Sequence, residues 1–157
     1  MWQPPVTDRT QADIDRAKYL LGIGYDNLTA AEKSEWDAGM KGCRNIGDIN
    51  RVLGNIQFLA DQVGVTVYTL PTQQYSGWLT DNITYSGEMS DLWKILQNLQ
   101  TLNDALSTAE PIPTDWLTFE GWNALEELLL TLSQSAGINN FPQIYAGDCY
   151  TGEENLI

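Results

Sequence analysis

Three stretches of the chain share one apolar spacing, and this repeated pattern limits the fold more than any other feature. Within residues 42–64, 84–108 and 118–137, large apolar residues recur at steps of three, four, three and four. This spacing places them on one face of a helix. Helices of this length are marginal alone in water, so each needs partners that cover its apolar face. The three stripes are Ile49, Val52, Ile56, Leu59 and Val63; Leu92, Ile95, Leu99, Leu102 and Leu106; and Trp122, Leu125, Leu129, Leu132 and Ala136.

The matched stripes predict an all-α fold, in which three long helices form an antiparallel bundle. Capping signals add a short helical pair before this bundle. Thr7 or Thr10 opens the first helix of the pair, and Thr29 with Glu32 forms a capping box for the second. Thr118 is placed to cap the last long helix. Glycines follow the stripes where left-handed backbone would end a helix.

The ends of the chain, and one segment inside it, lack this pattern. Two adjacent prolines make residues 1–9 an extended arm, and residues 138–157 are predicted to be an extended tail. Residues 10–137 between them form one helical domain, as the chain length predicts. An aromatic, turn-rich excursion at 65–85 interrupts this domain, and the alternation at its start is compatible with a small β-hairpin.

Charge is spread unevenly along the chain, whose net charge is −13. Residues 1–60 hold seven of the eight basic residues against eight acidic ones, whereas residues 61–157 hold one against thirteen. Because acidic surfaces repel phosphates and anionic lipids, we expect no direct contact with nucleic acid or membrane. The acidity favours solubility, or alternatively a basic partner.

The sequence offers little of what catalysis requires. It contains no histidine, and Cys43 and Cys149 are too few to complete a zinc site. We treat them as free thiols, and their pairing stays open. Glu126 and Glu127 are adjacent, so they point about 100° apart on a helix and are expected on a solvated face. We therefore predict a protein that is not an enzyme and that has no cofactor or metal.

Several motifs in the first third of the chain resemble a module of phage and prophage proteins from Gram-positive, gut-type bacteria. They are VTDRTQADIDRA at 6–17, LTAAEKSEW at 28–36, GMKG at 39–42, Asn45, and DINRV at 48–52. The resemblance spans residues 6–63 and continues weakly over 84–132. It implies a structural protein of a virion tail, baseplate or receptor-binding apparatus. It also implies other virion proteins as partners, and a virion location after synthesis in the bacterial cytoplasm, since the N-terminus shows no signal peptide.

Two sets of residues are candidates for contacts. Amide-rich positions on the second long helix and aromatic residues near the two ends are predicted to mediate homo-oligomer or virion assembly. These are Trp2, Gln97, Asn98, Thr101, Phe141, Tyr145 and Tyr150. Trp2 docks either on its own domain or on a neighbour. An alternative function is recognition of a cell-surface glycan, with Tyr75, Trp78 and Tyr85 stacking on sugars. A further alternative is an acidic decoy for a host DNA-binding protein.

Overall fold

The computed structural model describes residues 1–42, 46–69, 85–115 and 118–138, and the regular structure in these ranges is helical. The helices are α1 (Gln11–Ile23), α2 (Ala30–Asp37), α3 (Ile46–Val63), α4 (Tyr85–Leu106) and α5 (Phe119–Ser135), with a short 3-10 turn, η1 (Tyr25–Asn27), between α1 and α2. The all-α prediction is confirmed for these ranges. Residues 65–69 contain no strand, so this part of the predicted hairpin is wrong, and residues 70–84 lie outside the description.

The helix ends follow from side-chain caps and glycines. Thr10 and Thr29 each form a capping box with the acidic residue three positions on. Thr118 accepts a hydrogen bond from the third amide of α5. Gly64 and Gly137, which follow α3 and α5, have positive φ angles of 76° and 74°, where a side chain would be strained. These predicted caps are confirmed.

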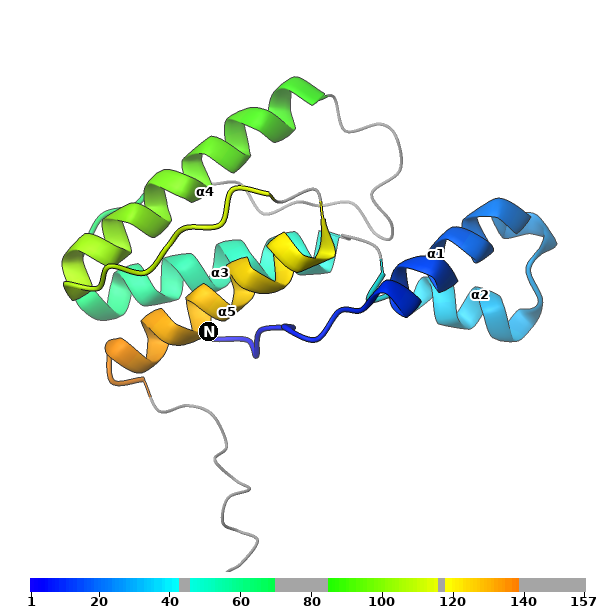
Figure 1. The fold of residues 1–157 in the computed structure, drawn as a ribbon, viewed down its shortest axis with the longest axis horizontal. Coiled ribbons are helices and arrows are strands. Elements are labelled where there is room, and N and C mark those ends of the chain that lie inside the picture. The colour runs from blue at the N-terminus through cyan, green and yellow to red at the C-terminus, as the bar shows by residue number, and fades with distance from the viewer. Residues whose placement is uncertain (43–45, 70–84, 116–117, 139–157) are drawn as a thin grey trace, which may run out of the picture.

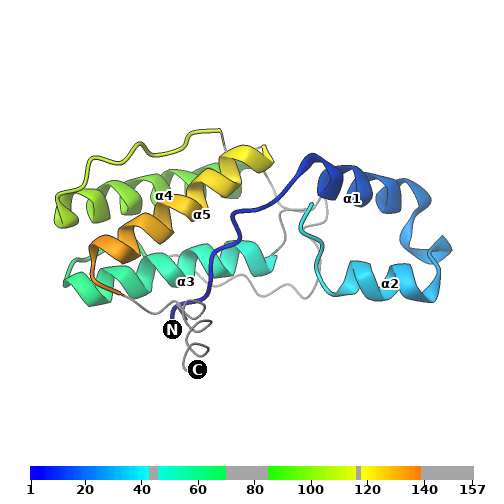
Figure 2. The same ribbon diagram turned by 60° about the horizontal axis from the view of Figure 1, so that its bottom comes forward.

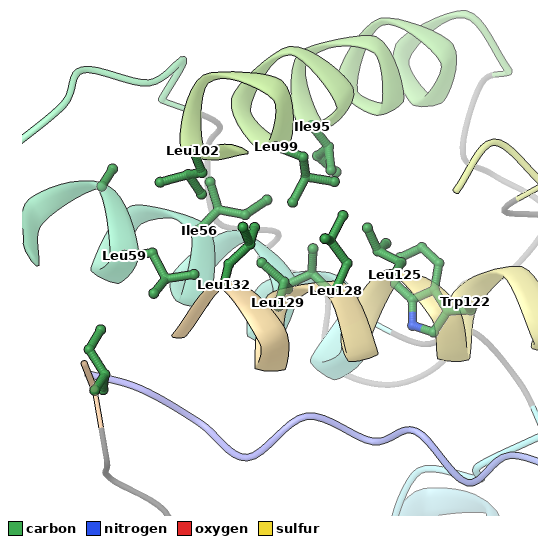
Figure 3. Packing of buried hydrophobic residues seen from close by; sticks show 13 residues of the cluster. Ile56, Leu59, Ile95, Leu99, Leu102, Trp122, Leu125, Leu128, Leu129 and Leu132 are labelled. Atoms are coloured by element: carbon green, nitrogen blue, oxygen red, sulfur yellow. The ribbon is translucent and has the colours of Figure 1, made fainter. Parts of the chain in front are cut away.

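The principal core lies where α3, α4 and α5 meet (Figure 3). Each helix contributes the middle of its stripe, and the central side chains are almost completely shielded from water. Burying a large apolar side chain contributes about 1.5–3 kcal/mol before conformational entropy is subtracted. The central members are Val52, Ile56, Leu59, Ile95, Leu99, Leu102, Leu125, Leu129 and Leu132.

The three long helices run in the same direction, so the predicted antiparallel arrangement is wrong (Figures 1 and 2). Leu59, Leu102 and Leu132, from the second halves of their helices, lie toward one end of the core (Figure 3). The connections explain this outcome. Residues 107–118 would reach about 40 Å if extended, whereas the 17 residues of α5 span about 26 Å. The chain therefore has the length to return to the starting end before each new helix.

The predicted short helical pair, α1 and α2, projects beyond the end of the bundle where α3 and α5 begin (Figures 1 and 2). It has a small core of its own, made of Ala17, Leu20, Leu28 and Met40. Gly42 brings the chain across the start of α1 at very short range. A Cβ atom there would lie 1.9 Å from the backbone oxygen of Asp13, which no real contact permits. The position therefore requires glycine.

The N-terminal arm is extended, as predicted, and lies along the bundle beside α3 and α5 (Figures 1 and 2). Trp2 packs against the principal core, with its ring centroid 6.1 Å from that of Phe58. Of the two docking alternatives for Trp2, the structure selects the chain's own domain. At the other end, Ile138 is buried against the same core, so the first residue of the predicted tail belongs to the folded domain.

Candidate functional site

A buried cluster of four charged side chains joins the arm to the bundle. Arg9 comes from the arm, Asp48 and Arg51 from the first turns of α3, and Glu126 from α5. Their side-chain exposures are 3%, 8%, 13% and 0%, respectively. Arg9 Nη2 lies 3.0 Å from Asp48 Oδ1 and 2.8 Å from Glu126 Oε1. The cluster, which we call the arm clamp, is neutral overall.

Glu126 is the centre of the arm clamp because both of its oxygens are shared. Arg51 donates from Nε and Nη2, each at 2.7 Å, and Arg9 donates from Nη2. The backbone N–H of Val6 donates to Oε2 at 2.8 Å. Burial alone would lower the pKa of Arg51, but the hydrogen bonds and charges of Glu126 and Asp48 outweigh it and raise that pKa. The guanidinium therefore stays charged in the folded protein.

Asparagine side chains hold the arm by pairing with its backbone. Asn55 accepts from the N–H of Gln3 and donates to its carbonyl oxygen, both at 2.8 Å. Asn123 does the same with Arg9, at 3.2 Å and 2.9 Å. An amide that satisfies both polar groups of one residue replaces the pairing that a neighbouring strand would provide. The backbone of the extended arm is thus hydrogen-bonded at Gln3 and Arg9 by side-chain amides of the helices.

The same arrangement holds the segment that follows α3. Asn98 of α4 accepts from the N–H of Tyr68 at 2.7 Å and donates to its carbonyl oxygen at 2.9 Å. In the segment after α4, the carbonyl oxygen of Glu110 accepts from Asn103 Nδ2 at 2.8 Å. Asn98 and Asn103 are only 2% and 3% exposed. Extended backbone along the bundle is thus satisfied by buried amides from the helices.

The structure corrects two of the predictions about polar residues. Glu126 was expected on a solvated face but is fully buried, while Glu127 is exposed as predicted. Asn98 was a candidate assembly contact but is occupied by Tyr68 inside the chain. The periodicity contains a usable signal, since Asn55, Asn98 and Glu126 each lie three or four residues before one stripe position and three or four after another.

The remaining predicted contacts have mixed positions. Trp2 is half-buried in its own domain, Gln97 is exposed, and Thr101 is half-buried with its hydroxyl donating to the Gln97 carbonyl oxygen. For Tyr85 only the backbone, at the start of α4, is described. The other five lie outside the described residues: Tyr75, Trp78, and the tail aromatics Phe141, Tyr145 and Tyr150. Of the candidates with described side chains, Gln97 and Thr101 lie one turn apart on α4, whereas Trp2 packs against the principal core.

Two surface grooves are lined by described residues. One, of about 340 Å³, runs along α3 beside residues 67–69 and is lined by Asn50, Gln57, Asp61 and Tyr68, among others. The other, also about 340 Å³, lies between α5 and the segment after α4. In the described ranges no three His, Cys, Asp or Glu side chains are placed to share a metal ion. Those ranges also contain no helix with the length and apolarity to cross a membrane.

Comparison with known proteins adds no further constraint on the chain. It matches no protein-family model, no curated protein and no solved structure.

Proposed function

We propose that this chain is a non-enzymatic structural or adaptor protein of a phage or phage-like particle, acting by self-assembly and contacts with other virion proteins. The arm clamp is the observation that carries the proposal. Arg9, Asp48 and Arg51 belong to the motifs on which the resemblance to virion proteins rests. These residues join the arm to the bundle, which is the role expected of motifs that specify a scaffold.

The helical pair supplies the surface for contacts in this proposal. It projects from the bundle and is fixed to it by the clamped arm (Figure 1). Tyr19, Leu21 and Tyr25 on the pair are 58%, 65% and 45% exposed. Exposed apolar side chains on a projecting element are typical of protein–protein contact sites. An adaptor needs such a contact element held at a fixed position on a rigid body.

Mass spectrometry of purified particles tests the proposal directly. We expect the protein among the particle components, and its consistent absence would refute the proposal. Leu21→Glu should reduce incorporation or self-association without changing the melting temperature, because Leu21 is largely in solvent. Gln57→Glu, on an exposed face of α3, is the matched control. Light scattering of the purified variants reports self-association separately from incorporation.

Glycan recognition is a second candidate, favoured by one pair of exposed aromatic rings. Tyr68 and Trp93 are each 53% exposed, and their ring centroids are 5.9 Å apart at an interplanar angle of 51°. Tyr68 also lines the groove along α3, together with amide side chains that suit sugar hydroxyls. Binding on a glycan array that Trp93→Ala abolishes would support this candidate. The absence of any glycan signal would remove it.

A further inference from the structure

The second groove lies between α5 and the segment that connects α4 to α5. Its edge is Glu110-Pro111-Ile112-Pro113, and its other wall is the exposed side of α5, with Ala124, Glu127, Leu128 and Thr131. We refer to it as the proline groove. Ile112 packs on the principal core, and Asn103 holds the carbonyl oxygen of Glu110. Both walls are thus anchored to the bundle, so the groove has a fixed shape.

The chemistry of the proline groove is amphipathic. Its lining includes proline rings and aliphatic side chains, which we call the floor, and the carboxylate residues Glu110 and Glu127, which we call the rim. Both glutamates are exposed, and among the described residues neither carboxylate forms an ion pair or a hydrogen bond. A partner that brings aliphatic groups to the floor and cations to the rim would complement both features.

We propose that the proline groove binds a basic, amphipathic segment of a partner protein, with leucine-like side chains on the floor and lysine or arginine at Glu110 and Glu127. Because Pro111 and Pro113 have no N–H, the edge cannot accept an added β-strand by regular backbone pairing. Recognition must therefore come from side chains. The net charge of −13 would draw such a segment toward the surface over several ångströms.

A second copy of this chain is a poorer occupant, because most of its described cations are already engaged. Arg9 and Arg51 lie in the arm clamp, Arg16 pairs with Glu35, and Lys41 pairs with Asp8. The occupant is therefore a different, basic chain. This inference rests on the proposed function in one respect, since it names the chemistry of the adaptor's partner.

Fluorescence anisotropy with a short labelled peptide of alternating lysine and leucine tests the inference on the purified protein. We expect saturable binding that Glu127→Lys or Glu110→Lys weakens by about tenfold or more. Asp61→Lys is the matched control, because it changes the charge equally at an exposed position on α3 that does not line the groove. It should change the affinity by less than about threefold. Thermal melting shows whether each variant remains folded.

Ala124→Glu distinguishes binding inside the groove from general attraction to its negative charge. The longer side chain fills the floor while adding a further negative charge, so we expect weaker binding despite stronger attraction. Tighter binding by this variant would overturn the inference, as would equal affinity for an oligolysine peptide of the same charge. An unchanged affinity in both rim variants would overturn it as well. The proposed function fails separately, by absence of the protein from particles.

Discussion

Replacing Glu126 with glutamine is the sharpest test of the arm clamp. The substitution keeps the size of the side chain but removes its charge, and glutamine cannot accept all four hydrogen bonds that the two arginines and Val6 donate to the carboxylate. Arg9 and Arg51 would then keep the carboxylate of Asp48 as their shared charged partner. Breaking a buried ion pair from one side costs about 3–5 kcal/mol, because a charge is left buried without its partner.

That cost is a large fraction of the total stability of about 5–15 kcal/mol expected for a domain. At about 2–4 °C per kcal/mol for a chain of this size, the melting temperature of Glu126→Gln should fall by roughly 6–20 °C. Urea unfolding followed by circular dichroism gives the free energy directly. Glu127→Gln, the adjacent exposed residue, is the control and should change stability by about 0.5 kcal/mol or less.

Equal stability of the two glutamine variants would refute the burial of Glu126 and the arm clamp with it. A double variant, Arg51→Met with Glu126→Leu, provides an independent check. Removing both charges leaves fewer groups unpaired, so the double variant should be more stable than the sum of the single losses predicts. Strict additivity would mean that Arg51 and Glu126 do not interact in solution.

One deletion and two substitutions test the remaining contacts. Deleting residues 1–6 should lower the free energy of unfolding by about 2–4 kcal/mol by urea titration, because Asn55 loses its partner and the site of Trp2 opens; an unchanged value would mean that the arm does not dock on its own chain. Asn98→Asp should lower the melting temperature, because a carboxylate would face the carbonyl oxygen of Tyr68; Gln97→Glu, which is exposed, should not. Gly42→Ala should destabilise the protein, because its Cβ would overlap the backbone of Asp13. Gly54→Ala, in open space on α3, should be neutral or stabilising by up to about 1 kcal/mol. A higher melting temperature for Gly42→Ala than for Gly54→Ala would contradict this packing.

Local sequence signals were sufficient to predict the α-helices of the described residues. The capping threonines and the apolar spacing are short-range patterns, and they located α1, α2, α3, α4 and α5 closely. Helix direction depends instead on the connections, whose residues show no periodicity. Residues 107–118 are long enough for either topology. Nothing local indicated that Asn103 would bind the carbonyl oxygen of Glu110 and hold this segment along the bundle.

The charged site is not evident from the sequence, because charged residues are mostly exposed in proteins. Glu126 and Glu127 are the same residue type, and only their positions relative to the apolar stripe distinguish them. Glu126 follows Trp122 by four residues and precedes Leu129 by three, which places it on the buried face. Its partners, Arg9 and Arg51, are distant in the chain. The spacing therefore indicates burial of Glu126, whereas its pairing becomes evident only in three dimensions.

The buried amide of Asn98 also favours the observed direction of α3 and α4. Asn98 lies on the buried face of α4, so any fold that packs the stripes together also removes its amide from water. Its partner, Tyr68, lies in the segment between α3 and α4, and a short antiparallel turn between these helices would not place that backbone alongside Asn98. The amide would then be buried without its partner, at a cost of about 1–3 kcal/mol. Asn55 and Glu126 take partners from the N-terminal arm, so their burial does not depend on how the long helices are connected. We infer that Asn98 disfavours the antiparallel alternative by about 1–3 kcal/mol, an appreciable part of the stability of a domain.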